Sequence, residues 1–299
     1  IPKYDGSNRD IAIPSYTLSI VQKWILINIL NKIEPSQSAM AFRRGNAYGY
    51  KQNSIHHSHA LYGLSMDIKD FFPSISANRI YTIFSNIGYN NFASTILTNL
   101  CTLEDKLPQG SATSPILSNL VSYNLDRRYI GFCEKRGIRY TRYADDMYFS
   151  CDDKGLLLKN LPIIQNIVIS EGFKINNNKT YFNTPSNKKV ITGITVIPGD
   201  KVGQFELKAN KRFKQKIRAK IHNCIVTGEY NNKENILGEI SYVAYVEKEN
   251  KIGYLSRIKK QISNMANKIK YFPELVEEYN NNLFFNDMKP IDSVGNSLC

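Results

Sequence analysis

Residues 142–148 have the sequence Arg-Tyr-Ala-Asp-Asp-Met-Tyr, in which Asp145 and Asp146 stand between two short strand-like runs. Neighbouring side chains of a flat strand point to opposite faces, but at a tight hairpin turn both carboxylates can approach one cation. Two carboxylates buried together repel each other, and a bound cation removes that cost. The segment therefore predicts a β-hairpin with a cation site at its turn. The alternative is an exposed acidic turn, which the flanking aromatic residues disfavour.

A second acidic motif lies at residues 66–74, with the sequence Met-Asp-Ile-Lys-Asp-Phe-Phe-Pro-Ser. Asp67 ends an apolar strand-like run that begins at Leu61, and Phe72 follows five residues later, where a bulky side chain could close a pocket. Phosphoryl transfer to a nucleotide uses two Mg²⁺ ions about 3.5–4 Å apart, held by hard oxygen ligands. Together with the hairpin pair, Asp67 supplies such ligands. By itself it would be ambiguous, because an aspartate at a strand end is usually structural.

The third motif lies at residues 107–115, with the sequence Leu-Pro-Gln-Gly-Ser-Ala-Thr-Ser-Pro. A glycine followed by small residues allows close backbone approach, so a flat ligand could lie against this segment. Taken alone, the motif predicts only a loop and the start of a helix.

These motifs, in this order and at these spacings, resemble the reverse transcriptases. The resemblance runs from about Arg9 to Lys270 and implies an α+β, right-hand polymerase fold with fingers, palm and a helical thumb. We expect residues 1–60 to form the N-terminal part of the fingers and 61–205 the palm with inserted helices. Residues 206–272 would form the thumb and 273–299 a C-terminal tail.

The resemblance also assigns roles to individual residues. Asp67, Asp145 and Asp146 would hold two Mg²⁺ ions, assisted by the Ile68 carbonyl. The residues implied to meet the incoming deoxynucleoside triphosphate are Arg9 at the triphosphate, Phe72 as the gate against a ribose 2′-hydroxyl, and Gln109 and Gly110. Lys179 would protonate the leaving pyrophosphate, and an exposed loop lysine is the alternative.

Within this family the chain is most similar to bacterial retron enzymes. Residues 53–57, Asn-Ser-Ile-His-His, resemble one retron marker element but have serine in place of alanine at residue 54. Residues 191–193, Ile-Thr-Gly, resemble another but have isoleucine in place of valine at residue 191. The residues that would contact RNA through these elements are Asn53, His57, Thr192 and Gly193. The histidine element could instead pack against the palm. A zinc site is not indicated, because no cysteine pair lies nearby.

A basic stripe follows from residue 207 onward, where Phe213, Ile217 and Ile221 predict an amphipathic helix. Its basic members recur every four residues: Lys208, Arg212, Lys216 and Lys220. Like charges at this spacing repel each other along a helix, and a bound polyanion would remove that cost. We therefore predict a surface that follows a nucleic-acid backbone. A solvated helix face is the alternative.

Composition is consistent with a polyanionic partner. The 299 residues include 39 Lys and Arg against 26 Asp and Glu, a net charge of +13. Such a balance favours nucleic acid or an anionic membrane surface. No apolar run is long enough to span a bilayer, and the five scattered cysteines fit a reducing cytoplasm.

Further elements follow from periodicity. We expect a helix over residues 17–33, one or two helices over 78–100 with a break at Gly88, a strand over 189–196 and a helix over 255–270.

Three hypotheses for function stand beside one another. The first is an RNA-directed DNA polymerase that copies its own structured RNA into a branched, RNA-linked single-stranded DNA. Such retron systems resemble phage-defence modules with a toxin or other effector protein as partner. The second is untemplated or protein-primed DNA synthesis of the abortive-infection type, and the third is a non-catalytic RNA-binding scaffold. The intact carboxylates, Phe72 and Gln109 disfavour the scaffold.

Overall fold

A computed structural model describes residues 10–198, 204–227 and 233–247 of the chain. The chain divides into two compact units, one of residues 1–192 with 200–205 and one of residues 193–199 with 206–299. Arg9 and the helix expected over residues 255–270 lie outside the described residues.

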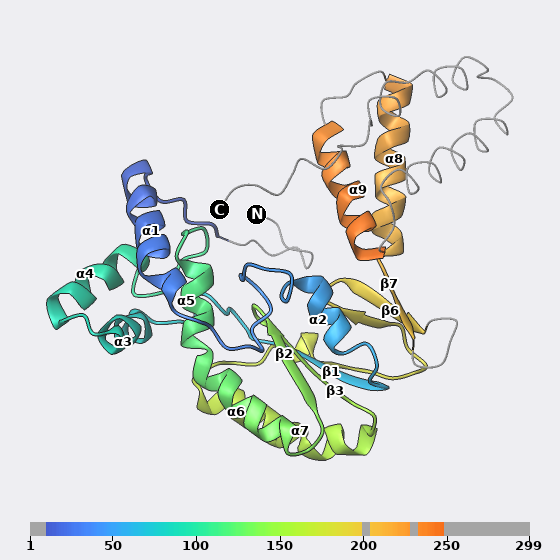
Figure 1. The fold of residues 1–299 in the computed structure, drawn as a ribbon, viewed down its shortest axis with the longest axis horizontal. Helices are drawn as coiled ribbons and strands as arrows, with labels where there is room; N and C mark the ends of the chain where they lie inside the picture. The colour runs from blue at the N-terminus through green and yellow to red at the C-terminus, as the bar shows by residue number, and fades with distance from the viewer. Residues whose placement is uncertain (1–9, 199–203, 228–232, 248–299) are drawn as a thin grey trace, which may run out of the picture. The chain divides into compact units, whose positions relative to one another are not determined.

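The first unit is built on a four-stranded sheet with the strand order β2-β3-β1-β4 (Figure 1). The strands are β1 (Tyr62–Asp67), β2 (Arg139–Tyr143), β3 (Asp146–Cys151) and β4 (Tyr181–Asn183). All three pairings in this sheet are antiparallel. The strand predicted to end at Asp67 and the two strands flanking the acidic turn are confirmed.

The two faces of this sheet differ in chemistry. Leu64 and Met66 of β1 and Met147 and Phe149 of β3 are fully buried and belong to the hydrophobic core. Helices α6 (Tyr123–Glu134) and α7 (Lys154–Ser170) pack against the strands on the core side (Figure 1). The alternate positions carry small or polar residues, because successive side chains of a strand point to opposite faces.

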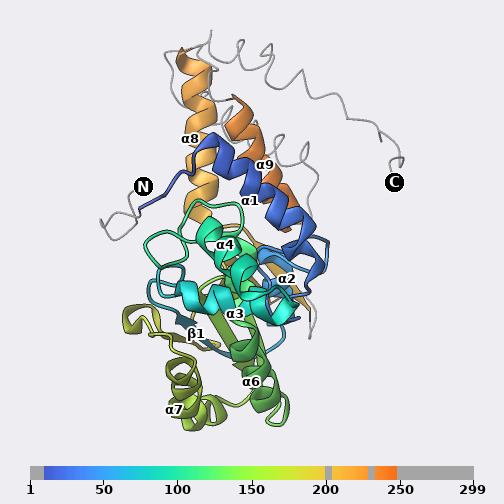
Figure 2. The same cartoon turned by 90° about the vertical axis from the view of Figure 1, so that its left-hand side faces the viewer.

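In the described part of the first unit, the short 3₁₀ helix Asn177–Lys179 follows α7, and the other helices precede α6 in the chain (Figure 2). They are α1 (Tyr16–Asn28), the short 3₁₀ helix Leu30–Lys32, α2 (Tyr50–His56), α3 (Ala77–Ile87), α4 (Asn91–Cys101) and α5 (Ser114–Val121). The break at Gly88 is confirmed: its φ of 109° is in the left-handed region that glycine adopts readily. The helix expected over 17–33 is shorter, since α1 ends at Asn28 and a 3₁₀ turn follows.

The strand expected over residues 189–196 is in fact two strands, β5 (Lys189–Ile191) and β6 (Ile194–Pro198). The cause is a turn at Thr192 and Gly193, whose φ angles of 46° and 79° are incompatible with a continuous strand.

The second unit contains β6, most of β7 (Phe205–Lys208), and helices α8 (Lys211–Thr227) and α9 (Lys233–Glu247). Helices α8 and α9 pack together, with Ile217 and Ile221 fully buried and the rings of Phe213 and Tyr242 5.5 Å apart. The predicted apolar stripe is confirmed. Lys208 lies in β7 before the helix begins, so the prediction that it belongs to one helical basic stripe is wrong.

Candidate active site

Strand register brings the predicted carboxylates to one end of the sheet. Asp67 is directly opposite Asp146 on the antiparallel strands β1 and β3, so both side chains point to the same face. Asp145 lies in the two-residue turn between β2 and β3, where its carbonyl accepts a hydrogen bond from the Ile68 amide at 3.0 Å. Residues far apart in sequence therefore meet at one turn.

The turn itself is strained. Ala144 has a φ of 57°, although it is not glycine, and the strands pair up to Tyr143 and Asp146 on either side of it. A non-glycine residue in this region costs about 1–3 kcal/mol and persists only where the surroundings impose it. The strain places Asp145 at the tip of the hairpin.

Negative charge is concentrated at this end of the sheet. Although Asp146 has solvent-exposed surface, desolvation raises the pKa of its carboxyl to about 7, and the charges of Asp145 and Asp67 act in the same direction. The Lys179 ammonium, 3.0 Å from Asp67 Oδ2, opposes that shift. Asn176 Nδ2 donates to the other Asp67 oxygen at 3.1 Å. The Lys179 ammonium thus offsets part of the negative charge beside Asp146.

This donor set suits a hard divalent cation, since it consists of carboxylate oxygens and a nearby carbonyl. Desolvation and the neighbouring carboxylates together raise the pKa of Asp146, and a bound cation would lower it. In the described parts of the chain, however, no three His, Cys, Asp or Glu side chains are gathered closely enough to hold a metal ion. A cation at this site would therefore take part of its coordination shell from water or from the phosphates of a substrate.

A cleft with a volume of about 600 Å³ opens beside the carboxylates. Six of the residues predicted from the sequence line it: Asp67, Ile68, Phe72, Gln109, Asp145 and Lys179. Segments that are separate in the sequence thus form one site, as the motif order predicted. The cleft is also lined by Phe42 and Asn176, which the sequence motifs do not identify as site residues, although Asn176 lies three residues before Lys179.

Two aromatic side chains form one wall of the cleft. The Phe72 ring is half-buried, lies 5.5 Å from Phe71 and lies 6.1 Å from Phe42. Phe42 is 44% exposed and has a φ of 60°, which turns the chain sharply at this point. Phe72 is therefore supported from two sides and presents a fixed apolar surface to the cleft.

Gly110 allows two segments of the backbone to pass close to each other. Its φ is 117°, and a Cβ at this position would lie 2.4 Å from the Ala12 carbonyl oxygen. The Ala12 amide donates to the Gln109 carbonyl at 2.8 Å. Glycine is required because the chain around Ala12, which also lines the cleft, passes directly against the loop. Gly110 itself is not among the lining residues.

The histidine element lies in the protein interior. His57 is fully buried, with Nδ1 2.7 Å from Ser150 Oγ and Nε2 2.7 Å from Thr141 Oγ1. Asn53 is 2% exposed and donates to Thr192 Oγ1 at 3.1 Å. The prediction that the Asn53 and His57 side chains bind RNA is therefore wrong, and the packing alternative describes them.

The second retron-like element, residues 191–193, is hydrogen-bonded to the first, residues 53–57. Ile191 accepts a hydrogen bond at its carbonyl from Ser54 Oγ at 3.0 Å, and Thr192 is half-buried beside α2. Ser54 thus uses a hydroxyl that the alanine of the retron pattern lacks. Gly193 is exposed, and its contact with RNA stays a prediction.

The basic residues of the second unit fall into two kinds. Lys208 and Lys220 form ion pairs with Glu206 and Glu239, at 2.8 and 2.6 Å. Arg212 and Lys216 are exposed on α8 and form no salt bridge with the part of the chain that the structure describes. RNA contact by all four stays a prediction.

Comparison with known proteins agrees with the fold. A model of the family described as reverse transcriptase (RNA-dependent DNA polymerase) matches residues 1–235. The retron Ec86 reverse transcriptase of Escherichia coli is 36% identical over 266 residues, covering 88% of this chain and 80% of that protein. The retron Mx162 reverse transcriptase of Myxococcus xanthus is 29% identical over 251 residues, covering 75% and 51%.

Among solved structures, telomerase from Candida albicans in complex with a fragment of telomeric RNA aligns with a TM-score of 0.51. The sequence identity is 12%, and the alignment covers 88% of this chain and 58% of that one, so the likeness concerns the fold alone. The chain has the α+β right-hand polymerase fold, and it belongs to the reverse transcriptase family, the RNA-dependent DNA polymerases.

Proposed function

We propose that this chain synthesises DNA on an RNA template by two-metal nucleotidyl transfer at Asp67, Asp145 and Asp146, with Mg²⁺ as the metal. The observation that carries the proposal is the cross-strand pair of Asp67 and Asp146 beside Asp145 at the turn. Two Mg²⁺ ions, when bound, would stabilise the attacking and leaving oxygens of the reaction.

The chain's own residues orient the reactants. The three carboxylates and the Ile68 carbonyl are the ligands available at the sheet end, and Gln109 and Phe72 border the cleft in which the nucleotide would lie. The bulk of Phe72 would exclude a ribose 2′-hydroxyl. Desolvation works against the charge on Lys179, but the hydrogen bond to Asp67 and the carboxylate charges keep the pKa of Lys179 raised. It therefore holds a proton that it can give to the leaving pyrophosphate.

We assign residues 1–60 to the fingers, 61–205 to the palm and 206–272 to the thumb, followed by a tail of residues 273–299. The boundary between palm and thumb is supported by the division of the chain into two compact units near residues 192–206. Within the thumb, the exposed Arg212 and Lys216 are the best placed to contact the phosphates of a template–primer duplex.

The similarity to retron enzymes suggests which RNA the chain copies. The similarity to retron reverse transcriptases supports a structured RNA that serves as template and also supplies the priming 2′-hydroxyl. The product would be single-stranded DNA joined to RNA by a branch. By the same similarity, we propose a role in phage defence together with a toxin or other effector protein. Among the described residues, no helix has the length and apolar character needed to span a bilayer.

The test is to purify the protein from its own cells and to sequence the nucleic acid that accompanies it. A short single-stranded DNA joined to a structured RNA supports the proposal and identifies the template. DNA of random sequence attached to protein contradicts it in favour of untemplated, protein-primed synthesis. RNA without DNA, unchanged after addition of deoxynucleotides and Mg²⁺, contradicts it in favour of RNA binding alone.

A further inference from the structure

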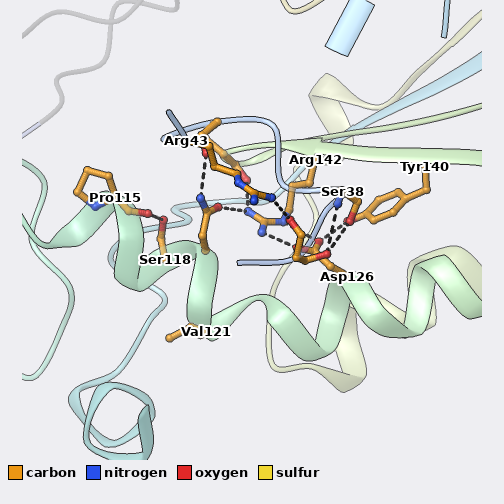
Figure 3. A network of polar contacts seen from close by, with 12 residues as sticks. Ser38, Arg43, Pro115, Ser118, Val121, Asp126, Tyr140 and Arg142 are labelled. Atoms are coloured by element: carbon orange, nitrogen blue, oxygen red, sulfur yellow. Dashed lines mark hydrogen bonds and ion pairs between the residues drawn. The ribbon is translucent and has the colours of Figure 1, made fainter. Parts of the chain in front are cut away.

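A buried ion pair lies behind the carboxylate turn (Figure 3). Arg142 and Asp126 are both 0% exposed, with Nε 2.8 Å from Oδ1 and Nη2 2.7 Å from Oδ2. The Tyr140 hydroxyl donates to Asp126 Oδ1 at 2.8 Å, which completes the partners of that oxygen. Figure 3 shows that Arg142 and Tyr140 reach Asp126 from strand β2, whereas Asp126 belongs to helix α6.

The remaining guanidinium nitrogen connects this pair to the turn. Arg142 Nη1 lies 3.1 Å from the carbonyl oxygen of Ala144, the strained residue that precedes Asp145. It also lies 3.2 Å from Asn119 Oδ1. Because strand side chains alternate, Arg142 lies on the sheet face opposite to Asp146 and holds the turn from behind.

Arg142 and Asn119 also fix the segment of residues 38–41. The Arg142 amide donates to the Ser38 carbonyl at 2.8 Å, and the Arg142 carbonyl accepts from the Met40 amide at 2.7 Å. Asn119 Nδ2 donates to the last carbonyl of the segment at 2.9 Å. All the residues that form these bonds are buried, so water has little access to them.

The segment ends at the aromatic wall. The residue after it is Phe42, whose backbone is left-handed and whose ring lies 6.1 Å from Phe72. One guanidinium group and one amide thus connect the turn that carries Asp145 to the wall that would contact the sugar of the nucleotide.

We propose that Arg142, with Asp126 and Asn119, is a positioning unit that sets the carboxylate turn and the Phe42–Phe72 wall in one fixed geometry. The inference rests on the proposed function, since the turn and the wall matter as parts of a nucleotide site. Arg142 touches neither substrate nor cation and acts through Ala144. It therefore determines both the rate and the sugar selectivity of DNA synthesis without being a catalytic residue.

Arginine is needed for geometric reasons. Its planar group has five N–H donors in a fixed arrangement, and here they serve Asp126, Asn119 and Ala144 at the same time. A lysine ammonium keeps the charge but cannot span these three partners. A buried ion pair is weak support for stability in itself, so its value here lies in the orientation it imposes.

The experiment compares three variants with wild type. Arg142→Lys weakens both arms of the unit, and Asn119→Ala removes the bond to the segment before Phe42. Tyr129→Phe is the matched control: its hydroxyl is buried on the same helix α6 and donates to the Ile164 carbonyl of α7 at 2.6 Å, without a hydrogen bond to Asp126, Arg142 or the turn, and the substitution keeps the ring that packs on Tyr140. Urea unfolding confirms that each variant is folded under the assay conditions.

The first readout is single-nucleotide incorporation on poly(rA) with an oligo(dT) primer, with dTTP compared with ribothymidine triphosphate. For Arg142→Lys we expect the maximal rate to fall about 10- to 100-fold, since small misplacements of reacting groups have effects of this size. The preference of Arg142→Lys for the deoxynucleotide over the ribonucleotide should fall by roughly tenfold. Asn119→Ala should lose the same selectivity, while its maximal rate stays within about threefold of wild type. Tyr129→Phe changes neither quantity by more than about twofold.

The second readout needs no catalysis. Hydrogen exchange reports the amides of Ile68 and Met40, which bond to the Asp145 and Arg142 carbonyls. In Arg142→Lys both exchange about tenfold faster than in wild type, and in Tyr129→Phe neither does. If Arg142→Lys does not fold, Tyr140→Phe is tested in its place, because it removes one hydrogen bond to Asp126. Its rate, selectivity and exchange should change in the same directions as expected for Arg142→Lys, but by less.

Unchanged rate, selectivity and exchange in a folded Arg142→Lys chain overturn the inference. Equal changes in Tyr129→Phe also overturn it, because they would show that lost stability alone is responsible. A wild-type chain that incorporates no nucleotide refutes the proposed function instead, and the exchange measurement then still decides whether Arg142 positions the turn.

Discussion

Two polar clusters lie on the same face of one sheet and behave in opposite ways. The carboxylate cluster consists of Asp67, Asp145 and Asp146. The histidine cluster consists of Asn53, His57, Thr141 and Ser150. Asp67 pairs with Asp146 at one end of β1 and β3, and Gly63 pairs with Ser150 near the other end. Asp146 and Ser150 are four residues apart on β3, so both side chains point to the face of the sheet away from the core.

The difference between them is charge balance. In the histidine cluster each ring nitrogen of His57 has a hydroxyl partner at 2.7 Å, and burial keeps the pKa of the ring well below its usual value. In the carboxylate cluster, desolvation and then the like charges of Asp145 and Asp67 raise the pKa of Asp146. A satisfied neutral network stabilises a fold, whereas neighbouring like charges with a perturbed pKa are typical of a site that binds an oppositely charged ligand. The predictions below test this division.

The largest effect is expected at the turn. Asp145→Asn keeps the shape of the side chain but removes a charged oxygen ligand. Since a bound cation contributes several kcal/mol to transition-state stabilisation, we expect the rate of DNA synthesis to fall by about 10³-fold or more. Primer extension under single-turnover conditions measures it. Asp152→Asn, just beyond the other end of β3, is the control and should retain activity within about twofold. Full activity in Asp145→Asn would remove the carboxylate cluster from the mechanism.

The next effect concerns stability. His57→Ala leaves the Ser150 hydroxyl without its partner, removes one of the two partners of the Thr141 hydroxyl and opens a cavity, so we expect the free energy of unfolding to fall by about 2–4 kcal/mol. Urea denaturation measures this change. The neighbouring His56 is exposed, so His56→Ala should change stability by less than about 0.5 kcal/mol. Activity per folded molecule should persist in both variants, and loss of activity in folded His57→Ala would contradict a purely structural cluster.

A smaller effect is expected from pH. Burial lowers the pKa of His57 well below 6.5, and the nearby charges of His56, Lys189 and Arg139 lower it further. Below pH 6.5 the unfolded chain therefore binds a proton that the folded chain does not, so stability falls as pH falls, by at most about 1.4 kcal/mol per pH unit. Urea denaturation at pH 7.5 and 5.5 should show a steeper loss in wild type than in His57→Gln. Equal losses would mean that His57 is protonated in the fold.

The smallest effect has the opposite sign. The folded-state pKa of Asp146, about 7, lies above its unfolded value of 3.8, so this group costs stability as pH rises through that window. Asp146→Asn should therefore make the chain slightly more stable at pH 8, by less than about 1 kcal/mol because the group is exposed, while it abolishes synthesis. Thermal unfolding at pH 8 and pH 5 measures the difference, and a loss of stability at pH 8 would show that the carboxylates are compensated.

The carboxylate cluster could be predicted from the sequence because its residues stand in short contiguous motifs with distinctive chemistry. Asp145 and Asp146 are adjacent, and Asp67 and Phe72 are five residues apart. The role of the histidine cluster could not be predicted in the same way. Whether His57 faces solvent or Thr141 depends on the packing of α2 against β2, which no local pattern encodes.

The positioning unit escaped prediction for a related reason. Arg142 stands inside the most conspicuous motif of the chain, yet its partners Asp126 and Asn119 lie 16 and 23 residues away on two helices. Lys208 was misassigned because four-residue spacing continues across the boundary between β7 and α8. Periodicity identifies a helix but does not locate its first residue.

The most direct test of the central claim is primer extension by the wild-type chain on an RNA template of defined mixed sequence, with one of the four deoxynucleotides omitted in turn. RNA-directed synthesis at the carboxylate cluster predicts a product that ends immediately before the first template base that requires the missing nucleotide, at a different position in each reaction. The Asp145→Asn chain should yield no product. Extension that ignores the omitted nucleotide, or that continues in the Asp145→Asn chain, would contradict templated synthesis at this site.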